Sequence, residues 1–583
     1  MDDLQAVTYF GETDSRNKRQ KFGIKNLDRS KHFYVIGKSG MGKSTLLENM
    51  AAQDIQNGHG FCFIDPHGGT AEKLLEYIPE SRIKDVLYFA PFDMEYPIAF
   101  NIMEDVGEEK RHLVVNGLMS VFEKIWEDAW SARMAYILQN TLLALLEYPG
   151  ATLLGVNKMY TDKEFRNKVV ANVTDVSVKS FWVDEFAKYT DKYVQEATPA
   201  IQNKIGQFAG NPLIRNIIGQ PKSSFDLRKI MDEKKIMIVN LSKGRVGEGN
   251  ARLLGSMLVT KIYLAAMSRA DESASTLSQL PPFYLFVDEF QSFADKSFAD
   301  ILSEARKYKL CLTMAHQYIE QMEEEVREAV FGNVGSMVAF RVGAYDAEVL
   351  EKEFAPVFTA EDLVNLGLRQ IYLKLMIDSV TSQPFSATTM APIEVPAIKY
   401  VKEVIEESRK VYAKTRAEVE KAITEWHAPS TKATETSGSH TPKSRGEFKP
   451  KPAMVERSPQ DTRNILKESL QPKPPAPKPE QPKQAPTHTH QDNKPKVSLE
   501  ELKKKQDNQR KPEQAKVSAL KEALSKISTN SQVSQQNSHS FTRQNPTGSD
   551  ADGNFAGSPS SQKVEVKKEP TPEELKKLLG HDQ

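Results

Sequence analysis

The chain has few cysteines and no long apolar run. Only Cys62 and Cys311 occur in 583 residues, each inside a short apolar segment. Two isolated thiols exclude a disulfide framework and suit buried side chains in a reducing compartment. No uninterrupted apolar stretch is long enough to cross a bilayer, and the N-terminus is polar rather than signal-like. We therefore expect a cytoplasmic protein without a membrane span, which reaches the inner face of a cell membrane only through partners.

Aromatic residues are scarce in the C-terminal part of the chain. From residue 427 onward only three aromatic residues occur beside 18 of the 32 prolines, and 27 basic residues face 19 acidic ones. This net charge of +8 leaves −8 for residues 1–426, so a balance of zero hides two different parts. A segment so poor in apolar surface cannot offset its chain entropy, and we expect residues 427–583 to be disordered. Short helical motifs are predicted inside it at residues 500–504, 518–527 and 573–577, either for a partner or as fluctuating helix.

A glycine-rich loop near the N-terminus carries the strongest signal. Residues 37–44 match the pattern G-x-x-x-x-G-K-[ST], after the apolar residues 33–36 and before a helical pattern of apolar residues. In this context backbone N–H groups surround phosphates at a helix N-terminus, the lysine reaches the terminal phosphates, and the serine hydroxyl ligates Mg²⁺. The predicted nucleotide site consists of Gly37, Lys38, Ser39, Gly40, Met41, Gly42, Lys43, Ser44 and Thr45.

Two carboxylates follow a second apolar segment. Residues 284–287 are apolar and lead into Asp288 and Glu289, as expected of a buried strand that ends at the ligand edge of an open α/β sheet. Asp288 is predicted to hold Mg²⁺ with Ser44, and Glu289 to polarise the attacking water as general base. A GTPase interpretation is disfavoured because no N-K-x-D motif for base recognition follows a strand.

Further candidate residues rest on weaker patterns. Gln317 ends an apolar strand, where its amide can contact both the γ-phosphate and the water, while the adjacent His316 fits packing better than catalysis. For Arg306, spacing alone leaves open a surface ion pair or an arginine finger for an adjacent subunit, with Arg341 as the competing finger. In the glycine-rich segment 242–249 after a predicted strand, Lys243 and Arg245 are the basic residues, and an ordinary surface turn fits this segment as well as a functional loop.

Alternating strand and helix patterns predict an α/β fold with a mainly parallel sheet. The strand signals stop between about residues 108 and 228, where helical periodicity takes over, and then return. The predicted organisation is a first part of the ATPase domain at 1–107, an all-helical insertion at 108–228, a second part of the ATPase domain at 229–395, an amphipathic helix at 396–426 and the tail at 427–583. Strands are expected at 33–36, 61–64, 86–89, 236–241, 283–287, 310–315, 337–341 and 371–375.

With these motifs assembled, the chain resembles the HerA/FtsK superfamily of ring ATPases over about residues 22–387. Within it, the likeness is greatest to the type IV coupling proteins of the TraD/TraG kind. The resemblance implies a RecA-like P-loop ATPase that uses ATP and Mg²⁺, with Glu289 as base, Gln317 as sensor and Arg306 as finger. It also implies a homohexamer that moves DNA through its pore, with membrane components of a type IV secretion system or a relaxase as partners. In such a pore Lys243 and Arg245 would be candidates for DNA contact.

Two departures from that family keep alternatives open. Coupling proteins commonly begin with membrane helices, which the chain as given lacks. The motif at residues 65–68, Asp-Pro-His-Gly, is at least as reminiscent of HerA, which would make the chain a DNA-processing translocase outside any secretion channel. A nucleotide-gated scaffold that recruits protein substrates through the tail is the third alternative.

Overall fold

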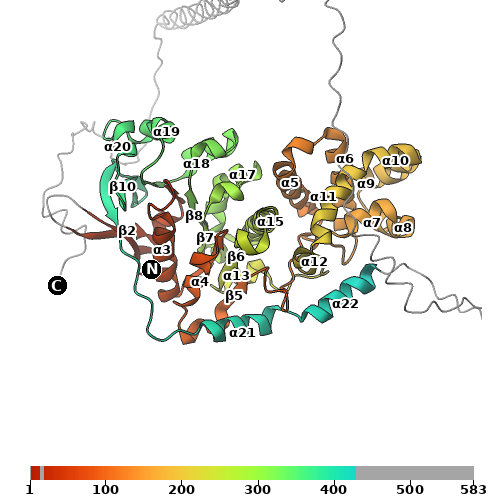
Figure 1. Ribbon diagram of the computed structural model, residues 1–583, viewed down its shortest axis with the longest axis horizontal. Helices are drawn as coiled ribbons and strands as arrows, with labels where there is room; N and C mark the ends of the chain where they lie inside the picture. The colour runs from red at the N-terminus through yellow and green to blue at the C-terminus, as the bar shows by residue number, and fades with distance from the viewer. Residues whose placement is uncertain (1, 14–18, 428–583) are drawn as a thin grey trace, which may run out of the picture. The chain divides into compact units, whose positions relative to one another are not determined.

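A computed structural model of the chain describes residues 2–13 and 19–427. Residues 428–583, including the predicted tail and its helical motifs, lie outside the described residues. The centre of the fold is a sheet in the order β2-β1-β13-β10-β9-β3-β8-β7-β4-β6-β5, with the first residues of the chain at one margin (Figure 1). The α/β fold is confirmed. The strands of the sheet are β1 Val7–Glu12, β2 Lys21–Lys25, β3 Phe33–Ile36, β4 Gly60–Asp65, β5 Val86–Phe89, β6 Ile236–Asn240, β7 Phe283–Val287, β8 Leu310–His316, β9 Ser336–Ala339, β10 Gln370–Lys374 and β13 Phe385–Thr389.

The seven strands from β9 to β5 are parallel, and their registers bring their ends to one edge. Ile36 pairs with His316 and with Ala339, while Val287 pairs with Ile64 and with Met314. The residues that directly follow β3, β4, β7, β8 and β9 therefore lie side by side at the carboxyl edge, where open parallel sheets bind ligands.

Burial on both faces explains why these strands read as continuous apolar runs. Every residue of β3, β6 and β7 is buried. Successive residues alternate between two cores: Tyr34 and Leu285 belong to one, and Phe33 and Tyr284 to the other. Cys62 and Cys311 are buried free thiols in this sheet, as the sequence predicts.

Four antiparallel strands, β10, β13, β1 and β2, complete the sheet on its other side. Of these, only β10 has a predicted counterpart. The strands β1 and β2 escape prediction because each is interrupted by a glycine and is only partly buried. At Gly23 a Cβ atom would lie 2.1 Å from the carbonyl oxygen of Thr8, so the close pairing of these two strands requires glycine. A separate small sheet consists of β11 Met376–Ile377 and β12 Val380–Thr381.

Between β5 and β6 the chain is helical and contains no strand, all of its residues being described. The first helix, α5 Glu108–Ile125, packs against α15 Glu248–Met267, and this approach is close enough that a Cβ atom at Gly117 would lie 2.4 Å from Thr260. The α-helices of this segment are α5, α6 Ala132–Leu146, α7 Gly155–Thr161, α8 Lys163–Asn172, α9 Val176–Ser180, α10 Asp191–Ala197, α11 Pro199–Gly210, α12 Pro212–Ile218 and α13 Leu227–Asp232.

The remaining helices surround the sheet, and none of the helices in the described part of the chain is long and apolar enough to span a membrane. They are α1 Asp2–Gln5, α2 Asn26–Arg29, α3 Lys43–Gln56, α4 Gly69–Leu75, α14 Lys243–Val246, α15, α16 Ala274–Gln279, α17 Ser297–Glu304, α18 Glu324–Asn333, α19 Ala344–Phe354 and α20 Ala360–Val364.

Two helices end the described chain where a single amphipathic helix was predicted. The helix α21 Val401–Tyr412 packs on the edge strand β5, and α22 Arg416–His427 packs on α12 (Figure 1). Between them Ala413 is extended and forms a β-bridge to Ile98, which interrupts the helix. Thr415 caps α22 through reciprocal bonds with Glu418.

Candidate functional site

The glycine-rich loop joins β3 to α3 at the carboxyl edge of the sheet. Gly40 and Gly42 have φ of 75° and 118°, left-handed values that glycine adopts without strain. At Gly37 a Cβ atom would lie 2.5 Å from the Cβ of Phe340. The backbone N–H groups of Lys43, Ser44 and Thr45, in the first turn of α3, have no helical acceptor, because the ladder starts with Leu46 bonding to Gly42. The loop thus presents donors to an anion.

Lys43 lies inside the loop rather than in solvent. Its Nζ donates to the carbonyl oxygens of Gly37 at 2.7 Å and Lys38 at 3.3 Å, and the residue is 6% exposed. Burial lowers the pKa of Lys43, against the opposing charges of Glu289 and Asp288. Among the described residues, the Lys43 ammonium thus hydrogen-bonds to two carbonyl groups and forms no ion pair. It can therefore move to a phosphate without breaking a contact with a carboxylate.

Ser44 and Asp288 meet although 244 positions separate them. The Ser44 Oγ donates to Oδ2 of Asp288 at 2.8 Å. Burial raises the pKa of Asp288, while the Ser44 bond opposes this. Among the described residues no cluster of three or more His, Cys, Asp or Glu could hold a metal. One hydroxyl and one carboxylate therefore fit Mg²⁺ only if phosphate oxygens and water supply the other ligands, which is how Mg²⁺ is usually bound.

Glu289 occupies the turn directly after β7 in a left-handed conformation, with φ 48° and ψ 49°. Its carboxylate lies 3.6 Å from Nε2 of His67 and accepts a hydrogen bond from the side-chain amide of Gln291. Burial alone would raise the pKa of Glu289, but the close His67, the hydrogen bond from Gln291 and the charge of Lys43 lower it to about 2. The carboxylate is therefore ionised at neutral pH, as a general base must be.

His67 belongs to the loop between β4 and α4, which the side chain of Asp65 holds. Asp65 accepts hydrogen bonds from the backbone N–H groups of His67 at 2.8 Å and Ala71 at 2.9 Å. Gly68 has φ 89°, and a Cβ atom there would lie 2.6 Å from Asn240, so the loop requires glycine. The nearby carboxylate of Glu289 raises the pKa of His67. Sequence reasoning did not assign His67 to the site, although its place after a strand was a usable signal.

Gln317 lies at the same edge, and its amide donates to the Ser39 hydroxyl of the loop. The preceding His316 is fully buried, hydrogen-bonds through Nδ1 to the hydroxyl of Tyr34 at 2.9 Å, and has its pKa lowered by burial to about 3. This environment is one of packing, not of proton exchange with a substrate.

A cavity of about 780 Å³ lies at this edge and is lined by several of these groups. The loop residue Ser39, the catalytic candidates Glu289 and Gln317, and His67 line it together with side chains from α5, α14 and α15, including Lys124, Lys243 and Arg252. The side chains of α5 were not anticipated here, because α5 belongs to the helical segment inserted in the sequence between β5 and β6.

Arg306 lies at the opposite edge of the sheet. It belongs to the short 3-10 turn Ala305–Tyr308 that precedes β8, so the seven residues of β8, roughly 20 Å, separate it from Gln317. Its side chain is exposed and has no hydrogen bond or ion pair with another described residue. Arg306 therefore cannot serve the nucleotide loop of its own chain.

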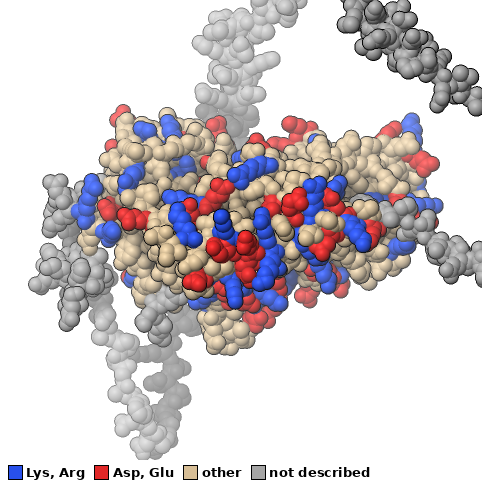
Figure 2. All heavy atoms as spheres, turned by 60° about the horizontal axis from the view of Figure 1, so that its bottom comes forward, with Lys and Arg blue, Asp and Glu red and all other residues tan. Residues whose placement is uncertain are grey.

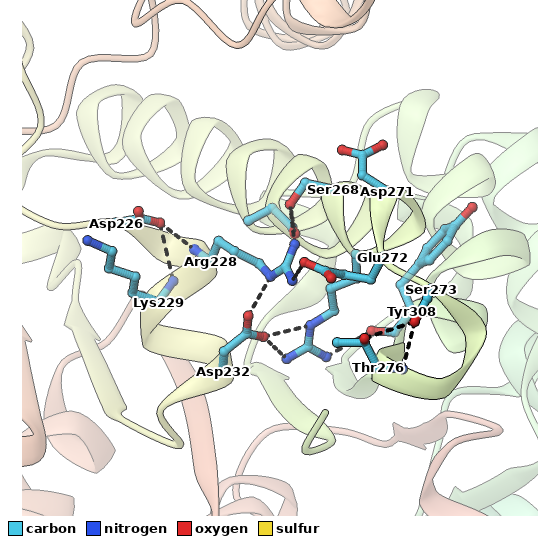
Figure 3. A network of polar contacts seen from close by, with 12 residues as sticks. Asp226, Arg228, Lys229, Asp232, Ser268, Asp271, Glu272, Ser273, Thr276 and Tyr308 are labelled. Carbon is cyan, nitrogen blue, oxygen red and sulfur yellow. Dashed lines mark hydrogen bonds and ion pairs between the residues drawn. The ribbon is translucent and has the colours of Figure 1, made fainter. Parts of the chain in front are cut away.

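The turn that carries Arg306 is firmly held. The guanidinium of Arg269, which is fully buried, donates to the carbonyl oxygen of Tyr308 at 2.9 Å and to the carboxylate of Asp232. Arg228 also bonds to Asp232, at 2.6 Å, and Figure 3 shows this pair. Lys309 adds bonds of 2.6 Å to the carbonyl oxygens of Ser278 and Leu280.

Three other basic residues lie beside the site in the same chain. Arg341 follows β9 and contacts Met41 of the nucleotide loop, with Nη2 3.3 Å from the sulfur. Lys243 lies 3.3 Å from the hydroxyl of Ser292. Arg245 pairs with Glu72 at 3.2 Å and stacks over Phe92. Nothing in the structure brings Lys243 or Arg245 to DNA, and that assignment stays a prediction.

The family model described as type IV secretory system conjugative DNA transfer matches residues 3–340, more than half of the chain. No curated protein matches the sequence. Among solved structures, the plasmid coupling protein TrwB in complex with ADP and Mg²⁺ is 14% identical with a TM-score of 0.47, over 68% of this chain and 98% of TrwB. The VirB4 protein of Thermoanaerobacter pseudethanolicus is 14% identical with a TM-score of 0.44, over 68% of this chain and 98% of VirB4.

Proposed function

The chain belongs to the type IV secretory system conjugative DNA transfer family, and from this premise we propose that it is an ATP-driven hexameric DNA translocase. Its role would be that of the coupling ATPase of a conjugative or type IV secretion system. The observation that carries the proposal is the 2.8 Å contact between Ser44 and Asp288, with Lys43 and Glu289 on either side. A triphosphate and its metal need these groups together, and only the fold brings them there.

ATP and Mg²⁺ are the cofactors that the site fits. The relative TrwB has been solved with ADP and Mg²⁺ and with a non-hydrolysable ATP analogue. In this chain the free N–H groups at the start of α3 hold the phosphates, and Lys43 contacts the terminal ones. Ser44 and Asp288 provide oxygen ligands for Mg²⁺, which supplies charge neutralisation at the phosphates when bound.

We assign the catalytic roles to two side chains that line the cavity. Glu289, kept ionised by His67 and Gln291, orients the attacking water and accepts its proton. Gln317, bonded to Ser39 at the loop, is placed to sense the terminal phosphate. Arg306 is exposed at the other sheet edge, so it is available to a neighbouring subunit as an arginine finger.

DNA, further copies of this chain, membrane components of the secretion system and a relaxase are the proposed partners. Basic side chains on the face in Figure 2 lie among acidic ones and form no patch of one sign. This mixed face is a poor nucleic-acid surface, since phosphate binding calls for clustered Lys and Arg. We therefore assign DNA contact to the segment after β6 that holds Lys243, which lines the cavity, and Arg245, which pairs with Glu72.

ATP hydrolysis with and without DNA tests the proposal. We expect the full chain to hydrolyse ATP in the presence of Mg²⁺. We also expect DNA to increase the rate of this hydrolysis. Glu289→Gln should retain ATP binding and reduce turnover by about a hundredfold or more, because the water loses its base. Full turnover in that variant would remove Glu289 from this role. Hydrolysis that is indifferent to single- and double-stranded DNA would instead favour the nucleotide-gated scaffold.

A further inference from the structure

The inserted helical segment contributes one cation to the cavity that holds Glu289. Lys124 lies in the last turn of α5 and lines this cavity. Its Nζ donates a hydrogen bond of 3.1 Å to the backbone carbonyl of Gln291. Within the described residues it forms no ion pair, although Glu123 beside it pairs with Lys296 at 3.4 Å. Among the described residues, the one hydrogen-bond acceptor of the Lys124 ammonium is therefore a main-chain oxygen.

The position of the Lys124 ammonium is unfavourable in free energy. Burial lowers the pKa of Lys124, against the more distant charges of Asp295 and Glu323. Taking an ammonium out of water costs free energy that a neutral carbonyl returns only in part. A lysine at the end of a surface helix would ordinarily extend into solvent.

The carbonyl that Lys124 holds belongs to the residue that holds Glu289. Gln291 donates through its side-chain amide to the Glu289 carboxylate, while its Oε1 is buried and has no hydrogen-bond partner among the described residues. The main chain and side chain of Gln291 thus connect Lys124 to Glu289 in two steps. Because its oxygen makes no hydrogen bond with a described residue, the Gln291 side-chain amide is stabilised less than a fully bonded amide would be. Its orientation therefore depends on the contact that Lys124 makes with the main chain of Gln291.

Glu289 needs such support because its own conformation is strained. A left-handed backbone is uncommon for a residue with a side chain and persists where the surroundings fix it. Local bonds contribute: Glu289 N–H donates to Asp288 Oδ1 at 2.9 Å, and Ser292 N–H donates to the Glu289 carbonyl at 2.8 Å. His67 and Lys243 contact Glu289 and Ser292 from other parts of the chain. Lys124 adds the contact that comes from the helical segment.

We propose that Lys124 is a positioning residue for Glu289, through which the inserted helical segment controls hydrolysis at the ATP site. The inference rests on the proposed ATPase function. A shift of α5 by the length of one hydrogen bond would release the Gln291 carbonyl and let the Glu289 turn relax, and a small misplacement of a catalytic base is costly in rate. A change in the position of the helical segment would then alter the rate of hydrolysis, although the segment does not contact the nucleotide.

The position of α5 itself does not depend on Lys124, which makes substitution informative. Gly117 packs against Thr260 of α15, and the ring of Phe122 stacks on Trp126 at 4.8 Å. Lys124→Met keeps the aliphatic stem and removes the donor, whereas Lys124→Arg keeps a donor. Lys296→Met is the matched control, because Lys296 lines the same cavity but is exposed and paired with Glu123.

Steady-state kinetics of the full-length chain decide between positioning and mere packing. We expect Lys124→Met to lower kcat for ATP by about tenfold to a hundredfold with KM changed less than about threefold, since the ground-state contacts remain. Lys124→Arg should recover most of kcat, and Lys296→Met should stay within about twofold. A kcat unchanged in Lys124→Met, or a loss that Lys124→Arg does not repair, would overturn the proposal.

Amide hydrogen exchange of the same variants separates this inference from the proposed function. Backbone amides of residues 289–293 should exchange faster in Lys124→Met than in the unmodified chain, and at an unchanged rate in Lys296→Met. If the unmodified chain does not hydrolyse ATP, the proposed function fails, yet exchange still tests Lys124. Equal exchange in Lys124→Met and the unmodified chain would refute a positioning role regardless of activity.

Discussion

Single residues at this site owe their chemistry to neighbours that are distant in sequence. The pKa of Glu289 is low because His67 lies near its carboxylate and Gln291 donates a hydrogen bond to it, and Lys43 lies where two carbonyl groups hold it. His32, just before β3, follows the same principle away from the site. It is fully buried, with Nδ1 accepting from the Leu312 N–H at 3.1 Å and Nε2 bonded to the carbonyl of Leu302 at 3.2 Å.

The buried His32 predicts a loss of stability in acid. Burial lowers its pKa from 6.5 to about 4, so between these values the unfolded chain binds a proton that the folded chain does not. Stability is therefore complete above pH 6.5 and falls as the pH decreases. By linkage, one such histidine costs about 2 kcal/mol between pH 7 and pH 5.

Urea unfolding at both pH values, with His32→Gln beside the unmodified chain, measures this effect. The variant should lose stability at pH 7, where it replaces a well-bonded ring, but show a smaller decrease from pH 7 to pH 5. His316, buried with a pKa of about 3, remains in both proteins and affects them alike. An identical pH dependence in the two proteins would contradict the assignment to His32.

At the scale of elements, the last two helices tie separate parts of the described chain together. The helix α21 is fixed to the sheet by a 2.9 Å bond from the Tyr88 N–H to the Ser408 hydroxyl and by the pair Arg409–Asp93 at 2.7 Å. The helix α22 instead packs Val419 and Ile423 on Leu154 of the helical segment. Its amphipathic face thus has a defined partner.

Truncation of Ile423 should release α22 selectively. Ile423 is 5% exposed, and Ile423→Ala would leave a cavity that costs about 2–4 kcal/mol of packing in this cluster. We expect faster amide exchange and faster tryptic cleavage across Arg416–His427, with unchanged affinity for an ATP analogue. Val411→Ala on α21 is the control, because Val411 is 53% exposed. Equal protection of α22 in both variants would show that Ile423 does not anchor it.

At the scale of the whole molecule, different candidate residues lie at the two ends of the parallel strands. The nucleotide loop lies at the carboxyl edge, and Arg306 lies at the amino edge of β8, where the bonds from Arg269 and Lys309 hold its turn. In a closed ring each subunit presents one edge to its neighbour's other face. Such an arrangement would complete each ATP site with a residue from the next chain.

Mixing two inactive variants tests whether sites are shared. The Arg306→Ala subunit retains an intact nucleotide loop, and the Lys43→Ala subunit retains Arg306. A site is complete where the first kind of subunit lies beside the second, so random assembly should restore activity in up to about a quarter of the sites. ATP hydrolysis after co-assembly is the measurement. Arg341→Ala mixed with Lys43→Ala is the control, because Arg341 contacts the loop of its own chain and should give no recovery. Absence of recovery with Arg306→Ala would mean that Arg306 is no shared finger.

Much of the fold could be predicted because parallel strands buried on both faces form apolar runs that need no context. The predicted strand at residues 33–36 coincides with β3, and the predicted strand at 283–287 coincides with β7. The edge strand β2 and its neighbour β1 were missed because half-exposed residues and glycines give no comparable pattern. The single helix predicted at residues 396–426 became two, because the pairing of Ala413 with Ile98 is a tertiary contact.

The sequence by itself determined the glycine-rich loop, the acidic strand end and the alternation that makes the sheet, because each is a local pattern of residue types. Only the tertiary structure decided that Ser44 meets Asp288, that His67 and Gln291 hold Glu289, and that Lys124 reaches the same cavity from an inserted helix. These contacts join residues from different strands and helices, and their geometry follows from strand order and helix packing, which no local pattern records.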